Sequence, residues 1–127
     1  MQLVLLTAAG GAIGAVLRFL VNQAGLKWVG PAFPWWTVFV NVTGSLAMGL
    51  LAALLMQRTA PSDGLRAFLA TGILGGYTTF SAFSLDFAGL LDRGEAGAAV
   101  LYAGGSVALS LMAVFLGLWL GRVLIAA

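Results

Sequence analysis

Four apolar stretches, each long enough to cross a lipid bilayer, constrain this chain more than any other feature. They run from about Leu3 to Val21, Trp35 to Met56, Leu65 to Leu91 and Ala98 to Leu124. A membrane helix needs about 20 largely apolar residues. Only 8% of the residues are charged, whereas a soluble domain has about 25%. The sequence therefore predicts an all-α membrane protein, with residues 1–127 forming a single domain of four transmembrane helices.

The residue types that are missing narrow the possible functions. The chain has no histidine and no cysteine, which removes the usual general base, the commonest metal ligand and any thiolate site. The net charge of +2 comes from scattered residues, which does not favour a nucleic-acid surface. We expect neither an enzyme nor a protein that binds nucleic acids.

The third apolar stretch is unusual between Gly72 and Ser84. Gly75 and Gly76 each weaken a helix by about 1 kcal/mol relative to alanine. The sequence therefore predicts that the third helix is broken near mid-membrane, around Gly75 to Thr79. Non-helical backbone at that depth is tolerated only where it is buried in protein or lines a cavity, and membrane proteins use such breaks to build ion sites.

Phenyl rings alternate with hydroxyl groups directly after the predicted break. Phe80 and Phe83 stand at helical spacing, and Ser81 and Ser84 lie on the adjoining face. A phenyl ring has a positive edge, so rings among hydroxyl donors offer weak positive charge without a full cation. That combination suits a small anion that must give up its water shell and still leave. An aromatic stripe that only packs is the simpler alternative.

Two polar residues in the first two helices have both a structural and a functional interpretation. Asn41 lies well inside the second helix, with Thr37 and Ser45 one turn away on the same face. Its amide could join two helices or donate an N–H to an anion. Arg18, late in the first helix, could extend to the interface or attract anions at a pore vestibule.

The last two helices carry similar ambiguities. Tyr102, Ser106 and Ser110 form a one-faced stripe, although serine hydroxyls often bond back to their own helix. Asp86 is the only carboxylate within a predicted helix. An intramembrane acid is a functional candidate, but a position at a solvated mouth of the third helix is the alternative.

The positive charges give no preferred orientation in the membrane. If both termini share a side, three positive residues lie on each side: Arg58, Arg66 and Arg122 on one, and Lys27, Arg93 and Arg18 on the other. The positive-inside rule then does not choose between the two orientations. Either the chain has too few charges to show a bias, or it inserts both ways and pairs as an antiparallel dimer.

Small residues recur at four-residue spacing in all four helices. The pairs are Gly10 and Gly14, Ser45 and Gly49, Gly72 and Gly76, and Gly117 and Gly121. Such pairs let helix backbones approach closely, so we expect a tightly packed bundle.

Three blocks of this sequence resemble a known family, the small dual-topology fluoride channels (Fluc, also called CrcB). They are residues 10–19 (GGAIGAVLRF), residues 40–45 (VNVTGS) and residues 75–84 (GGYTTFSAFS). The length and the four-helix layout match as well. The family often has Phe at the position of Tyr77, Cys at Leu74 and Thr at Ala82, and the last difference removes a hydroxyl.

The resemblance implies a fluoride-selective channel that lets cytoplasmic fluoride leave passively across a prokaryotic plasma membrane. It implies an antiparallel homodimer in the lipid bilayer, with separate fluoride pores and a structural sodium ion held by the backbone carbonyls of Gly75 and Thr78. The residues that it assigns to the pore are Asn41, Thr79, Phe80, Ser81, Phe83, Ser84, Tyr102 and Ser110. Arg18 matches the arginine that closes the first block and is expected at the vestibule.

Two other classes of protein remain open. A small proton-coupled multidrug or cation exporter shares the size and the dual topology, and it would need a membrane-embedded carboxylate, for which Asp86 is the candidate. A membrane scaffold that transports nothing would explain the glycine packing but not the row of hydroxyl and phenyl groups.

Overall fold

The computed structural model describes residues 1–56 and 62–126, and all regular structure within these ranges is helical. The helices are α1 (Gln2–Trp28), α2 (Trp35–Met56), α3 (Asp63–Leu65), the π-helix η1 (Arg66–Leu74), α4 (Gly75–Tyr77), α5 (Phe80–Asp92) and α6 (Ala96–Ala126). Four stretches are long and apolar enough to cross a membrane: Gln2–Trp28, Trp35–Met56, Asp63–Asp92 and Ala96–Ala126. The predicted all-helical chain with four membrane-capable helices is confirmed.

The first helix is longer than the sequence pattern predicted. α1 continues past Val21 to Trp28, although Asn22, Gln23 and Lys27 make this end polar. No proline interrupts it, and the chain turns only at Gly30, whose φ of 87° lies in the left-handed region that favours glycine.

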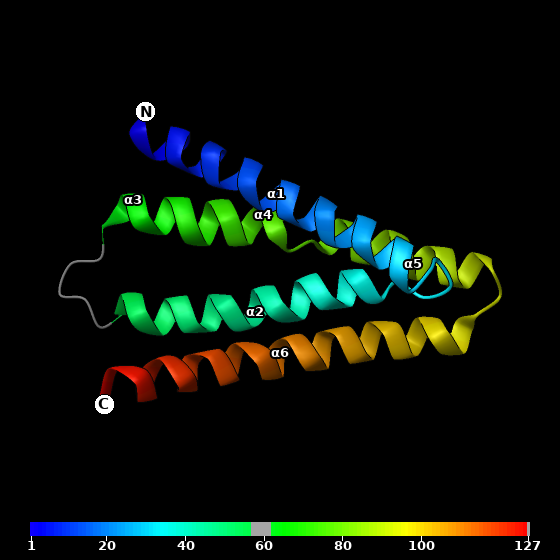
Figure 1. Cartoon of the computed structure of the whole chain (residues 1–127). Coiled ribbons are helices and arrows are strands. Elements are labelled where there is room, and N and C mark those ends of the chain that lie inside the picture. Colours follow the sequence, from blue (N-terminus) through cyan, green and yellow to red (C-terminus); the bar gives the residue numbers. More distant parts are fainter. Residues whose placement is uncertain (57–61, 127) are drawn as a thin grey trace.

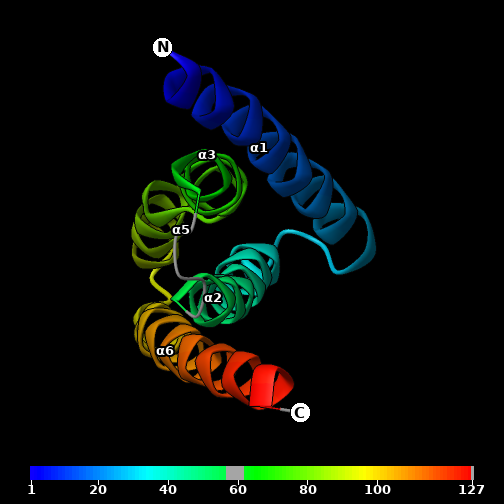
Figure 2. The same cartoon turned by 90° about the vertical axis from the view of Figure 1, so that its left-hand side faces the viewer.

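The helices pair in two sets. α2 packs along α6, and α1 packs along η1 and α4. Viewed from one end, α1 and α6 lie on opposite sides, with α2, α3 and α5 between them (Figure 2). Both termini lie at the end where α3 begins, and the α1–α2 and α5–α6 connections lie at the other end (Figure 1).

Glycines sit where the paired helices come closest. A Cβ at Gly49 of α2 would overlap the carbonyl oxygen of Val114 in α6, and a Cβ at Gly117 would overlap that of Leu46. Gly10 meets the backbone of η1 in the same way. The close packing predicted from the small-residue spacing is therefore present within the described chain.

Few side chains are buried in a single copy of the chain. One small core joins Leu90, Ala99 and Tyr102, while most large apolar side chains on α1 and α6 are exposed. Exposed apolar surface on this scale suits lipid or a further subunit rather than water.

Four of the positive residues stand at or near helix ends. Arg66 begins η1 and Arg122 lies in the last turns of α6, while Lys27 lies in the last turn of α1 and Arg93 follows α5. The first two helix ends lie with the termini, and the other two lie at the opposite end of the bundle (Figure 1). Arg58 lies outside the described residues.

Candidate functional site

The helical path of the third stretch is interrupted at Thr78 and Thr79. Both residues have extended backbone, with ψ of 158° and 128°. The Thr79 hydroxyl then accepts a hydrogen bond from the Ala82 N–H at 3.1 Å and caps the start of α5. Gly75 and Gly76, which the sequence placed within the break, are still helical. Gly76 instead lets α4 approach α1, since a Cβ there would meet the carbonyl oxygen of Gly11.

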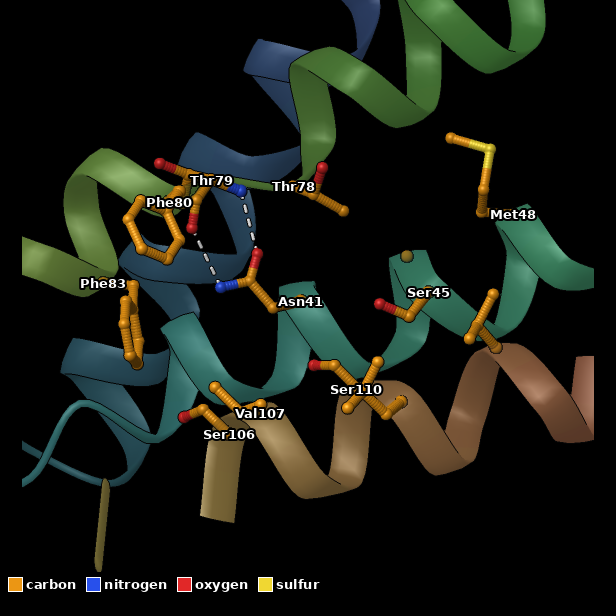
Figure 3. A pocket seen from close by; sticks show the side chains of 13 residues that line it. Asn41, Ser45, Met48, Thr78, Thr79, Phe80, Phe83, Ser106, Val107 and Ser110 are labelled. Carbon is orange, nitrogen blue, oxygen red and sulfur yellow. Dashed lines mark hydrogen bonds between the residues drawn. The ribbon is translucent and has the colours of Figure 1, made fainter. Parts of the chain in front are cut away.

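Asn41 of α2 fixes this interruption through two hydrogen bonds. The Thr79 N–H donates to Asn41 Oδ1 at 2.8 Å, and Asn41 Nδ2 donates to the Thr79 carbonyl oxygen at 2.9 Å (Figure 3). An amide nitrogen has two N–H groups, so one remains after the bond to Thr79. Asn41 thus joins two helices and also keeps a donor at the edge of a pocket.

A pocket of about 420 Å³ lies between α2, the interruption, α5 and α6 (Figure 3). Its lining residues are Asn41, Gly44, Ser45, Met48, Thr78, Thr79, Phe80, Phe83, Ser106, Val107, Ser110, Leu111 and Val114. None of these side chains carries a charge. The pocket therefore offers amide, hydroxyl and phenyl groups and no full cation or anion.

The structure brings five of the predicted pore residues to this pocket: Asn41, Thr79, Phe80, Phe83 and Ser110. The Phe80 and Phe83 ring centroids are 5.3 Å apart, with 38° between the ring planes. Phe80 is 76% exposed, so the same chain does not cover the pocket on that side.

Ser106 is a lining residue that the predicted pore set omitted. It is 5% exposed, and its hydroxyl has no hydrogen-bond partner among the described residues. A buried hydroxyl without a partner is costly unless another group binds it. The one-faced spacing of Tyr102, Ser106 and Ser110 was the signal that could have identified it.

Three other predicted pore residues do not line the pocket. Ser81 and Ser84 are exposed on α5, where the Ser84 hydroxyl donates to the Phe80 carbonyl oxygen at 2.9 Å. Tyr102 is buried behind the pocket, and its ring centroid lies 5.2 Å from that of Phe83.

Asp86 is linked to two other helices. Its Oδ2 accepts the Thr37 hydroxyl of α2 at 2.6 Å and the Tyr102 hydroxyl of α6 at 3.1 Å. The residue is only partly exposed. Asp86 therefore holds α2, α5 and α6 together behind Phe83. A position at a solvated mouth of the third helix stays a prediction.

The interruption leaves backbone carbonyls without their helical partners. The amide that would bond to Gly75 O belongs to Thr79 and donates to Asn41 instead. The amide that would bond to Thr78 O belongs to Ala82 and donates to the Thr79 hydroxyl. Backbone carbonyl oxygens are among the ligands that hard cations take in proteins.

Arg18 lies at the same interruption but away from the pocket. Its Nε donates to the Gly76 carbonyl oxygen at 3.1 Å. This bond ties α1 to the last turn of α4 and replaces a helical partner that the break removes. A role at a vestibule stays a prediction.

The chain is similar to known proteins over nearly its whole length. The family described as CrcB-like protein, Camphor Resistance (CrcB), matches residues 5–118. A protein of Rhizobium meliloti named fluoride-specific ion channel FluC is 53% identical over 98% of this chain and 100% of its own length. A protein of Rhodospirillum centenum with the same name is 51% identical over 99% and 100%. A third, from Agrobacterium fabrum, is 50% identical over 92% and 94%. With its interrupted third helix, its uncharged pocket and these matches, the chain belongs to the CrcB-like protein family.

Proposed function

We propose that this protein is a passive, fluoride-selective channel. The observation that carries the proposal is the pocket in which an amide N–H of Asn41, several hydroxyls and the Phe80 and Phe83 rings meet without any charged group. Relatives that match at 50–53% identity over almost their full length are named fluoride-specific ion channels. A channel forms and breaks no covalent bond in its ligand, which is consistent with the lack of histidine and cysteine.

The chemistry of the lining explains how a small anion could pass. An anion that enters a narrow space must replace its water shell, but it must bind weakly enough to leave. Hydroxyls and an amide donate hydrogen bonds, and phenyl rings present positive edges. A guanidinium in the same place would hold the anion more strongly, since an ion pair in a low-dielectric space is stronger than one in water.

An antiparallel homodimer would complete the pocket. Phe80 and Leu85 are 76% and 74% exposed, and the hydroxyls of Ser81 and Ser84 are exposed beside them. A row of hydroxyls and rings facing lipid would leave polar groups poorly matched. A second copy placed over this face would bring Ser81 and Ser84 toward a shared pathway, and the even division of positive charge allows it to insert in the opposite orientation.

A structural sodium ion fits the carbonyl groups at the interruption. The oxygens of Gly75 and Thr78 lack their helical partners, and Gly75 is exposed, so a second copy could add the same two oxygens. Sodium would supply positive charge that holds these oxygens together across the dimer axis. If sodium does this, replacing it with N-methylglucamine during purification should lower the melting temperature of the dimer; an unchanged melting temperature would exclude the role.

The expected location is the plasma membrane of a bacterium, where such a channel would let cytoplasmic fluoride leave down its gradient. Four membrane-capable helices and bacterial relatives support a multi-pass membrane protein. Export by a proton-coupled mechanism through Asp86 is the second candidate, and it is favoured only by that one carboxylate in a membrane helix.

Anion efflux from liposomes that contain the purified protein tests the proposal. We expect rapid fluoride loss with chloride retained, a large reduction in Phe80→Ile, and substantial flux in Asp86→Asn. Phe115→Ile is the matched control, because Phe115 is 68% exposed on α6 and lines none of the pockets described here. The absence of fluoride flux from a stable wild-type sample would contradict the channel proposal. Loss of transport in Asp86→Asn, with uptake of an organic cation by the wild type, would support the exporter.

A further inference from the structure

A second pocket continues the first one toward the end of the bundle that carries the termini. It has a volume of about 260 Å³, and Met48 lines both pockets. Its lining residues are Met48, Leu51, Ala52, Leu55, Met56, Arg66 and Ala70. Arg66 is the only charged residue among them, and it comes from the first turn of η1.

One face of α2 runs through both pockets. Asn41, Ser45 and Met48 stand at i, i+4 and i+7, and Ala52 and Leu55 continue the same face at i+11 and i+14. Residues at these spacings lie above one another on a helix. The two pockets are therefore successive parts of one groove, with Asn41 and the phenyl rings deep in it and Arg66 at its outer part.

The Arg66 side chain has its charge available to this groove. The ion pair found in residues 1–56 and 62–126 joins Arg93 to Glu95, at the opposite end of the bundle. Asp63 precedes Arg66 by three residues but is exposed and makes no ion pair with it in the described chain.

We propose that Arg66 forms an entry site for small monovalent anions at one mouth of the groove. The inference rests on the proposed channel function and adds to it the residue that gathers the ion. A positive charge beside apolar walls concentrates anions locally and raises the rate at which they enter. At the mouth, unlike in the narrow part, water still surrounds the guanidinium, so the anion is attracted without being trapped.

The test is single-channel fluoride conductance in planar bilayers at low fluoride, with ionic strength adjusted by sodium gluconate. Arg66→Gln should lower the conductance about three- to fivefold at 10 mM ionic strength and by less than about 1.5-fold at 500 mM, because salt screens a mouth charge. Arg66→Lys should retain most of the wild-type conductance. Arg122→Gln is the matched control, since Arg122 lies near the C-terminal end of α6, is exposed and lines none of the described pockets.

The outcomes separate this inference from the channel proposal. A wild type that conducts fluoride, together with Arg66→Gln that conducts equally at every ionic strength, overturns the entry site alone. Equal losses in Arg66→Gln and Arg122→Gln would also overturn it, since a general surface charge would then explain the effect. If Arg66→Gln does not yield folded protein, the wild-type channel is measured alone at fixed fluoride and rising sodium gluconate. A wild-type conductance that does not fall as gluconate rises contradicts a charge at the mouth. A wild type without fluoride conductance contradicts the channel itself.

Discussion

At the scale of single residues, hydrogen bonds between helices determine how the candidate pathway is shaped. Asn41 holds the backbone of Thr79 from both sides, and Asp86 holds the Thr37 and Tyr102 hydroxyls behind Phe83. The Asn41 amide and the Asp86 carboxylate both need hydrogen-bond partners that lipid tails cannot supply. Their geometry places the Phe83 ring between the pocket and the Tyr102 ring.

Removing the Tyr102 hydroxyl should destabilise the protein more than removing the Tyr77 hydroxyl. Tyr102 is 1% exposed, and its loss leaves Asp86 Oδ2 with the Thr37 hydroxyl alone. The Tyr77 hydroxyl meets Thr43 at 3.0 Å, but Thr43 also bonds to its own helix through the Phe39 carbonyl oxygen. We expect a loss in the free energy of unfolding of about 1–2 kcal/mol for Tyr102→Phe and about 0.5 kcal/mol for Tyr77→Phe. Unfolding by titration with sodium dodecyl sulfate measures both, and equal losses would show that Asp86 does not depend on Tyr102.

At the scale of the helices, glycines allow two close pairings that support the interruption. α1 meets η1 and α4 at Gly10, Gly14 and Gly76, and α2 meets α6 at Gly49 and Gly117. The non-helical Thr78 and Thr79 lie between these pairings. α1 therefore supplies Arg18 and α2 supplies Asn41 at short range to backbone groups that the interruption leaves free.

A side chain added at the α2–α6 contact should separate these helices. A Cβ at Gly49 would overlap the Val114 carbonyl oxygen, which is backbone and cannot move alone. We expect Gly49→Ala to lower the free energy of unfolding by about 2 kcal/mol and to reduce fluoride flux, because Ser106 and Ser110 of α6 would shift away from Asn41. Gly104→Ala is the control: a Cβ there meets nothing within 4 Å, so it should leave stability unchanged or slightly higher. Equal effects of the two substitutions would contradict the close contact.

The sequence predicted the helices and much of the pocket, and its predicted interruption, Gly75 to Thr79, includes the extended Thr78 and Thr79 but begins three residues too early. Apolar length identified the four spans, and the spacing of small residues identified the close contacts. Gly75 and Gly76 looked like helix breakers, yet they remain helical because Gly76 serves the contact with α1. The π-helix Arg66–Leu74 was not predicted, since a change in hydrogen-bond register leaves the apolar pattern intact. The bond between Asp86 and Tyr102 joins residues 16 positions apart on different helices, so spacing within one helix could not indicate it.

At the scale of the whole molecule, one copy exposes a face of α5 that mixes polar and apolar side chains, and it leaves the pocket open at this face. Phe80 and Leu85 are largely exposed there beside Ser81 and Ser84, and the pocket opens past Phe80. Positive residues occur at both ends of the bundle, since Arg66 and Arg122 lie in helix ends near the termini and Lys27 and Arg93 lie at the opposite helix ends. A second copy inserted in the opposite orientation would cover the exposed face of α5, and it is compatible with positive charge at both ends.

Removing positive residues from one end of the bundle should make all copies insert in one orientation and should abolish most of the fluoride flux. On the sides that the sequence predicts, Lys27→Gln with Arg93→Gln leaves three positive residues toward the end that carries the termini and only Arg18 toward the other. Arg58→Gln with Arg122→Gln leaves only Arg66 toward the termini and three positive residues toward the other end. Because positive residues favour the cytoplasmic side, the two variants should insert in opposite orientations. We expect each variant alone to give little fluoride flux and their coexpression to restore it, since only the mixture contains both orientations. Cysteine-accessibility labelling at an added terminal cysteine measures the orientations, and the cysteine-free chain has no competing thiol. Full flux from either variant alone, with all copies labelled from one side, would show that a parallel assembly or a single copy is sufficient.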